Sequence, residues 1–167
     1  MIIEPLSEAH LAETIHLVHR VFPREASMSD PPGNALKASL HVDEYQELLR
    51  ERGIRKLAYY TALDETTNQV LGVIGQYEQE GDPPDLVWVG WFCVDPACRG
   101  QKVGESLLRW NMQHAKAQGY TLMKLYTSDL PNEQAAQGLY QKLGFEVEHV
   151  QAVEGTGYHL LFRERPL

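Results

Sequence analysis

The stretch "FCVDPACRGQKVGESLL", Phe92 to Leu108, decides the fold of this chain. Its first residues end the apolar segment "LVWVGWFCV" at 86–94, which is expected to form a central strand buried on both faces. Gly90 within that segment suggests a bulge or a close backbone approach. From Val103 the apolar residues recur at helical spacing, and Gly119 ends the expected helix. The stretch is therefore a strand-to-helix connection that carries glycines and cations.

This connection has two interpretations on its residues alone. In one, Gly100 and Gly104 let the backbone approach a phosphate at the start of a helix, and Arg99 and Lys102 add positive charge. In the other, Gly100 closes a turn and Gly104 allows tight packing of the helix. The spacing excludes a P-loop, because Glu105 follows the second glycine where lysine is needed, and it excludes the GxGxxG dinucleotide fingerprint.

The flanking segments predict one mixed α/β domain over residues 1–167. A short strand at 1–7 is followed by a helix that Ser7 caps and Pro23 ends. The rest is expected as a loop at 24–34, a helix at 42–53, a hairpin of strands at 54–63 and 69–80, a strand at 120–128, a helix at 132–144, and a closing hairpin of strands at 145–153 and 157–164.

Composition narrows the class of protein. The chain has 23 acidic and 15 basic residues and a formal net charge of -8, which argues against nucleic-acid binding. No apolar run is long enough for a membrane span, and the first residues do not read as a signal peptide. Cys93 and Cys98 form no metal motif, and the histidines have no metal-ligand spacing. We therefore expect a cytoplasmic protein without a metal or membrane site.

The opening stretch resembles the central motif of the GNAT superfamily of acyl-CoA N-acyltransferases. That motif is a strand ending in a V-x-P-like turn, then Arg/Gln-x-x-Gly-x-Gly/Ala, then a helix. Arg99 and Gly104 match it, and Lys102 stands where the family usually has glycine.

A second motif supports the resemblance. The segment "NEQAAQGLYQKLGFE", residues 132–146, is similar to the family's Asn-x-x-Ala-…-Leu-Tyr-x-x-x-Gly-Phe stretch. Leu139, Tyr140 and the later Gly-Phe pair match in register. Asn132 lies one residue early, and Glu133 occupies the usual place of the asparagine.

The resemblance implies an α/β fold with a mixed, splayed, mostly antiparallel sheet of about seven strands flanked by four helices. The fourth and fifth strands part, and the pantetheine arm of acetyl-CoA enters the gap. Backbone groups of the fourth strand pair with that arm, the following turn holds the pyrophosphate, and the second motif adds one further contact. The implied cofactor-binding residues are Phe92, Cys93, Val94, Arg99, Gly100, Gln101, Lys102, Val103, Gly104 and Asn132.

The implied activity is transfer of an acetyl group from acetyl-CoA to a primary amine by direct attack in a ternary complex. Tyr140 would be the catalytic residue, protonating the departing thiolate, although its spacing also fits a core aromatic. A backbone N–H near Val94 would polarise the carbonyl group. The acceptor is a small-molecule or peptide amine, and a homodimer is among the arrangements the resemblance implies.

Several questions stay open on the sequence. Many members carry a general-base glutamate on the fourth strand, and this chain has none, which leaves Glu78, Glu80, Asp85 and His41 as candidates without a distinguishing signal. Gly138 either admits the cofactor or a neighbouring backbone, or lies on an exposed face. The alternative functions are a CoA-binding regulatory domain without catalytic activity and an interaction module without a ligand.

Overall fold

The computed structural model describes all residues from 1 to 167. Its α-helices and strands are, in chain order, β1 (Ile2–Pro5), α1 (Glu8–Val21), α2 (Pro23–Ala26), α3 (Pro32–Leu40), α4 (Gln46–Glu51), β2 (Ile54–Leu63), β3 (Val70–Gln79), β4 (Leu86–Val89), β5 (Cys93–Val94), α5 (Val103–Ala117), β6 (Leu122–Ser128), α6 (Gln134–Lys142), β7 (Glu146–Ala152) and β8 (His159–Pro166). Two 3₁₀ turns, η1 (Pro96–Cys98) and η2 (Pro131–Glu133), precede α5 and α6.

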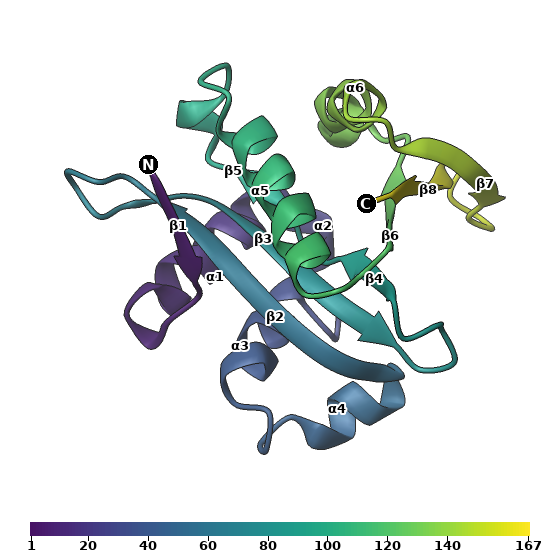
Figure 1. Cartoon of the computed structure of the whole chain (residues 1–167), viewed down its shortest axis with the longest axis horizontal. Helices are drawn as coiled ribbons and strands as arrows, with labels where there is room; N and C mark the ends of the chain where they lie inside the picture. Colours follow the sequence, from purple (N-terminus) through teal and green to yellow (C-terminus); the bar gives the residue numbers. More distant parts are fainter.

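The strands form one mixed sheet with the order β1-β2-β3-β4-β6-β8-β7, and β5 pairs with β3 beyond the end of β4. All neighbouring strands are antiparallel except β4 and β6, which run parallel. Figure 1 shows the long strands β2 and β3 crossing the molecule, with β7 and β8 at the far edge. The predicted fold class, a mixed and mostly antiparallel sheet with helices, is confirmed.

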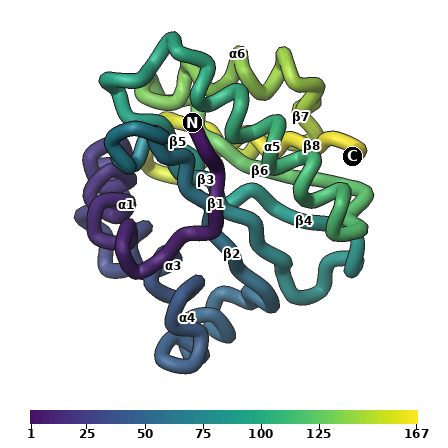
Figure 2. Tube along the Cα trace, turned by 60° about the vertical axis from the view of Figure 1, so that its left-hand side comes forward, coloured from purple at the N-terminus to yellow at the C-terminus, as the bar shows by residue number.

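Helices cover the two faces of the sheet separately. In Figure 1, α5 lies in front of β2 and β3, while α1 and α3 lie behind them. The front core contains Leu107 of α5 and Phe145 beside α6, and the rear core contains Val18 of α1 and Leu36 of α3. The turned view in Figure 2 likewise separates α1 and α3 from α5 and α6. Burial of an apolar stripe on each helix fixes this layering.

The sheet opens in its middle, as the resemblance implied. Strand β4 pairs with β6 only from Leu86 opposite Leu122 to Trp88 opposite Lys124. Beyond that point β6 continues to Ser128 and pairs with β8 alone, while β5 stays with β3. The two halves of the sheet therefore separate between β5 and the second half of β6.

A β-bulge separates β4 from β5. Val89 faces Gln76, and the N–H of Gly90 donates to the carbonyl of Gly75 at 2.9 Å. Further along, Cys93 faces Val73, so the register has shifted by one residue between Gly90 and Cys93. The expectation of one continuous strand over 86–94 is therefore wrong, whereas the bulge suggested by Gly90 is present.

Two glycines make room for the tyrosine ring that lies over this bulge. A Cβ atom on Gly75 would come 2.5 Å from the Tyr59 ring, and one on Gly90 would come 3.0 Å from its hydroxyl oxygen. The Tyr59 hydroxyl accepts a hydrogen bond from the N–H of Trp91 at 3.3 Å. Tyr59 thus occupies the space above both glycines and binds the backbone where the register shifts.

The N-terminal helices differ from the sequence prediction. Residues 24–34, expected as a loop, contain the end of α2 and the start of α3. Proline is tolerated in the first turn of a helix because its missing N–H has no partner there, so the Pro31–Pro32 pair begins α3 rather than preventing it. The helix expected at 42–53 is shortened to α4, and Ser7 takes the N-cap position of α1 without a side-chain capping bond.

No helix has the length and apolar character needed to cross a bilayer. No group of three or more histidine, cysteine, aspartate or glutamate side chains is arranged to hold a metal ion.

Gly75→Ala is expected to destabilise the fold by about 1–3 kcal/mol, because the new methyl group would overlap the Tyr59 ring. Gly138→Ala is the matched control, since no atom lies within 4 Å of its added Cβ and the position is helical. That change is expected to stabilise the fold by up to ~1 kcal/mol. Urea unfolding measures both variants, and equal stabilities would contradict the proposed role of the glycine slot.

Candidate active site

The turn between β5 and α5 is held by Asp95. Its side chain accepts a hydrogen bond from the N–H of Ala97 at 2.9 Å and forms an ion pair with Arg20 of α1 at 2.7 Å. The Asp95 N–H donates to the carbonyl of Leu71 on β3 at 2.8 Å. The hydrogen bond from Ala97 is the main reason that the pKa of Asp95 lies below its usual value. The start of α5 is thereby fixed relative to the bulged strand.

The start of α5 presents free backbone donors to solvent. The N–H groups of five residues have no hydrogen-bond partner within the chain, and these are Gly100, Lys102, Val103, Gly104 and Glu105. Arg99 and the other residues up to Lys102 are exposed. Unpaired N–H groups and the positive end of the helix dipole together form the geometry that binds phosphate groups.

Lys102 explains why the family usually has glycine at this position. It is the N-cap residue of α5 and has φ 62° and ψ 11°, in the left-handed region. The turn forms with lysine, but this conformation costs an L-residue with a Cβ roughly 1–2 kcal/mol. The left-handed backbone was not predicted from the sequence.

The open edge of β5 lies beside the gap in the sheet. The N–H of Asp95 bonds to Leu71, and Cys93 faces Val73, so the backbone of Val94 points away from β3. The N–H of Phe92 also has no partner within the chain. The residues expected to pair with an extended ligand therefore offer unpaired donors toward the opening.

A cavity of about 580 Å³ runs through this opening. It is lined on one side of the sheet by residues of the rear core, among them Phe22 and Tyr59. It is also lined by Leu125 and Tyr140, which belong to the front core. The cavity is thus lined from both faces of the sheet.

Tyr140 of α6 lies at the front wall of this cavity. The residue is 6% exposed, and its ring centroid is 6.3 Å from that of Phe92 and 6.1 Å from that of Phe145. Its hydroxyl is not among the fully enclosed polar atoms that lack a partner, and no group of the chain bonds to it. Burial is the main reason that its pKa is raised above the usual value, so Tyr140 is a neutral phenol able to donate a proton.

Three contacts fix the position of α6. The buried guanidinium of Arg163 on β8 donates to the carbonyl of Phe145 at 2.9 Å and to Gln137 Oε1 at 3.0 Å. The Nε2 group of Gln137 donates to the carbonyl of Ser128 at 2.8 Å. Gln137 and Tyr140 lie one turn apart on the helix, so this bracket also sets the position of Tyr140.

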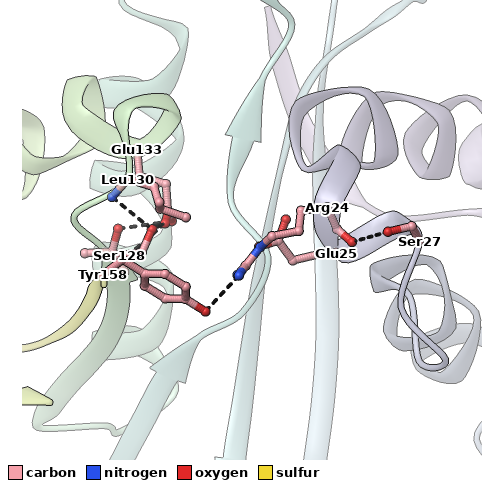
Figure 3. A network of polar contacts seen from close by, with 8 residues as sticks. Arg24, Glu25, Ser27, Ser128, Leu130, Glu133 and Tyr158 are labelled. Atoms are coloured by element: carbon pink, nitrogen blue, oxygen red, sulfur yellow. Dashed lines mark hydrogen bonds and ion pairs between the residues drawn. The ribbon is translucent and has the colours of Figure 1, made fainter. Parts of the chain in front are cut away.

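Glu133, rather than Asn132, points into the site at the start of α6. Its carboxylate accepts hydrogen bonds from Thr127 Oγ1 at 3.1 Å, from the N–H of Ser128 at 2.8 Å and from the Ser128 hydroxyl. Glu133 lines the cavity, whereas Asn132 is exposed, makes no side-chain hydrogen bond and does not line it. Figure 3 shows Glu133 and Ser128 on one side and Arg24 and Glu25 on the other.

One contact spans the cavity between these two groups. Arg24 of α2 donates a hydrogen bond to the hydroxyl of Tyr158 at 2.9 Å, and its guanidinium lies 4.7 Å from the centroid of the tyrosine ring (Figure 3). Arg24 is also paired with Glu25 at 2.8 Å. The short helix α2 and the turn between β7 and β8 therefore meet at the rim of the cavity.

The four candidate bases named from the sequence do not line the cavity; they are Glu78, Glu80, Asp85 and His41. Burial opposes ionisation of Glu78, but hydrogen bonds from Tyr120 and Arg55 outweigh it and lower its pKa. The carboxylates that do line the cavity are Glu25, Asp30 and Glu133. Only the displaced asparagine of the second motif signalled any of them, because it put Glu133 in the family position.

Comparison with known proteins agrees with this geometry. The sequence model of the family described as "Acetyltransferase (GNAT) domain" matches residues 55–147, more than half of the chain. The chain belongs to the GNAT acetyltransferase family. The resemblance inferred from the two motifs is therefore confirmed. The family match begins at β2, ends in β7, and includes both motifs.

Curated relatives in the GNAT family match a smaller region. Human N-acetyltransferase 8B is 35% identical over 86 residues, which is 49% of this chain and 36% of that protein. N-acetyltransferase 8F1 of Rattus norvegicus is 34% identical over 84 residues, 49% of this chain and 37% of that protein. The matched part therefore spans little more than a third of the length of these relatives.

Solved structures share the GNAT fold over the whole chain. A ribosomal-protein-alanine N-acetyltransferase from Brucella melitensis has a TM-score of 0.72, 17% identity and full coverage of both chains. An aminoglycoside 6'-N-acetyltransferase solved with coenzyme A has a TM-score of 0.71 at 16% identity, with 99% of this chain and 97% of that chain covered. At these identities the likeness shows the fold alone.

Lys102→Gly is expected to stabilise the protein by about 1 kcal/mol, because glycine adopts the left-handed conformation without steric cost. Lys102→Ala is the control, since it removes the same charge and keeps the Cβ. Urea unfolding is expected to give the Lys102→Ala variant a free energy of unfolding close to that of the wild type. A glycine variant no more stable than the alanine variant would contradict the cost assigned to the left-handed backbone.

Proposed function

We propose that this protein transfers an acetyl group from acetyl-CoA to a primary amine by direct attack in a ternary complex. The observation that carries the proposal is the cavity through the splayed sheet, which joins the face bearing α5 and α6 to the face bearing α1 and α3. Membership of the GNAT family supports the acetyl donor. We infer that residues 1–167 act as one catalytic domain, and that two free cysteines suit a reducing cytoplasm.

The free donors at the start of α5 suit the pyrophosphate of CoA. The unpaired N–H groups from Gly100 to Glu105 would hold the phosphates, with Arg99 and Lys102 adding positive charge. The open edge of β5 at Phe92 to Val94 would pair with the amides of the pantetheine arm, as an added strand does. Asn132, which is exposed, stays a predicted contact only.

Acetyl transfer forms a bond between the amine nitrogen and the carbonyl carbon and breaks the bond from that carbon to sulfur. An unpaired backbone N–H on the bulged strand, near Val94, would stabilise the negative charge that develops on the carbonyl oxygen. Tyr140 would give its proton to the departing thiolate. The nitrogen loses a proton as the amide forms, which restores the proton balance.

Two alternatives make different predictions. A CoA-binding regulatory domain would bind CoA without turnover, and the strained backbone at Lys102 and the absence of a glutamate on β4 or β5 are the features that favour it. An interaction module would not bind CoA. A ligand at 100-fold excess over its Kd stabilises a protein by about 2.7 kcal/mol, so an interaction module would show no thermal shift with CoA, whereas an acetyltransferase would.

A regulatory domain would show the thermal shift but would release no thiol from acetyl-CoA in the presence of an amine library.

Lys102 offers a direct test of the phosphate site. Lys102→Gly and Lys102→Ala are both expected to weaken CoA binding about fivefold, since an exposed ion pair contributes up to ~1 kcal/mol. Calorimetric titration with CoA measures both variants. Tighter binding would show instead that the side chain obstructs the cofactor, and unchanged binding would place the phosphates elsewhere.

Tyr140→Phe is expected to lower kcat by about 100-fold or more while leaving the Kd for CoA unchanged, because only the proton donor is removed. Tyr126→Phe is the control, since Tyr126 lines the same cavity but is 52% exposed. Steady-state kinetics and CoA titration provide the two readouts. A Tyr140→Phe enzyme with the wild-type kcat would leave Tyr140 with a packing role only.

A further inference from the structure

Glu133 differs from the other carboxylates of the cavity in having no cationic partner. Glu25 is paired with Arg24 at 2.8 Å, and Asp30 is paired with Arg52. Glu133 takes part in no ion pair, and its hydrogen-bond donors are hydroxyl and amide groups. One carboxylate of the cavity wall therefore has no direct cationic partner.

A chain of hydrogen bonds connects this carboxylate to the buried Arg163. Arg163 donates to Gln137, Gln137 Nε2 donates to Thr127 Oγ1 at 3.3 Å, and Thr127 Oγ1 donates to Glu133 at 3.1 Å. Arg163 is 8% exposed and has no carboxylate within ion-pair distance, so Glu133 is its counter-charge through this chain. Every donor in this chain points toward Glu133, which is the acceptor at its end.

The carboxylate has room for one further hydrogen-bond donor. Three of its roughly four acceptor sites are used by Thr127 and Ser128, which leaves one for a ligand in the cavity. The cations that line the cavity, Arg24 and Arg52, are paired with Glu25 and Asp30, and His159 next to Tyr158 is paired with Asp129 at 2.9 Å. No free cation among these groups competes for Glu133.

The remaining walls suit an apolar, planar body. Aromatic side chains line the cavity on several elements, among them Tyr59, Tyr77, Trp91 and Tyr126. Aromatic faces bind both apolar groups and cations. Glu133 and Tyr140 lie two turns apart on the same face of the helix that begins after Glu133, which places their Cα atoms about 10 Å apart. A small ligand can therefore contact the carboxylate while it extends toward the tyrosine.

We propose that Glu133 binds the ammonium group of the incoming acceptor and thereby selects cationic primary amines with an aromatic body. This inference rests on the proposed function for the identity of the acceptor site. The ammonium group supplies N–H donors to the free acceptor site of the carboxylate, and the proton that must leave before attack passes to water in the open cavity. Glu133 is thus a specificity-determining residue that acts on acceptor affinity.

The test compares 2-phenylethylammonium with its neutral isostere 2-phenylethanol. Trp91 lines the cavity, so tryptophan fluorescence, with calorimetry as a check, reports binding of either probe. The wild type is expected to bind the ammonium at least about tenfold more tightly than the alcohol, as a hydrogen bond between charged groups provides. The Glu133→Gln variant is expected to lose this preference, because the substitution weakens binding of the ammonium probe and leaves binding of the alcohol unchanged. Equal affinities of the wild type for both probes would overturn the inference, whether or not the variant folds.

Ser128→Ala separates charge from structure, because it removes one hydroxyl contact to Glu133 and keeps the carboxylate. It is expected to retain the preference for the ammonium. If Ser128→Ala loses the preference as fully as Glu133→Gln does, Glu133 serves to hold the end of β6, and the inference is wrong. Urea unfolding of both variants shows whether each is folded in the binding assay.

Turnover distinguishes this inference from the proposed function. With acetyl-CoA and 2-phenylethylamine, Glu133→Gln is expected to raise KM by the same factor as the ammonium Kd, with a smaller change in kcat. If the wild type transfers acetyl groups and the variant has the same KM, the inference fails while the proposed function stands. If the wild type neither binds CoA nor releases its thiol, the proposed function fails irrespective of amine binding.

Discussion

The packing of Tyr59 over two glycines is the constraint on which the rest of the site depends. Its ring fills the space above Gly75 and Gly90, and its hydroxyl holds the N–H of Trp91 at the register shift. A side chain on either glycine would displace the ring. The shift leaves β5 paired with β3 and leaves β6 unpaired on that side beyond Lys124. The opening in the sheet is thus built from backbone geometry and one aromatic ring.

The two faces of the sheet carry different groups beside the opening. The front face presents the free N–H groups of α5 and the phenol of Tyr140, which suit a phosphorylated thioester. The rear face presents aromatic rings and the paired charges of Arg24 and Glu25 on α2, which suit an acceptor. Glu133 lies where the two regions meet, and the buried Arg163 stabilises it through Gln137 and Thr127. The helix α6 and its contacts therefore position both Tyr140 and Glu133 at this junction.

Much of the fold could be predicted because local patterns encode it. The hairpin of β2 and β3, the helix α5 and the closing hairpin follow from apolar periodicity and turn residues. The prediction failed for α3, since a Pro-Pro-Gly sequence is typical of a loop but also fits the first turn of a helix. It also failed for the apolar run at 86–94, where the break depends on Tyr59, more than twenty residues earlier in the chain. Hydrophobicity alone cannot indicate such a break.

Residues close together in the chain were enough to identify the family, to locate the turn expected to bind phosphate and to place Tyr140 on its helix. Only the tertiary structure decided which carboxylates reach the cavity. Glu78, Glu80 and Asp85 lie near the central strand in sequence but outside the cavity, while Glu25 and Asp30 reach it from the α2–α3 region and Glu133 from the start of α6. The left-handed backbone of Lys102 and the contact between Arg24 and Tyr158 could likewise not be predicted from the sequence. These features depend on contacts between segments that folding brings together, and local sequence patterns do not record them.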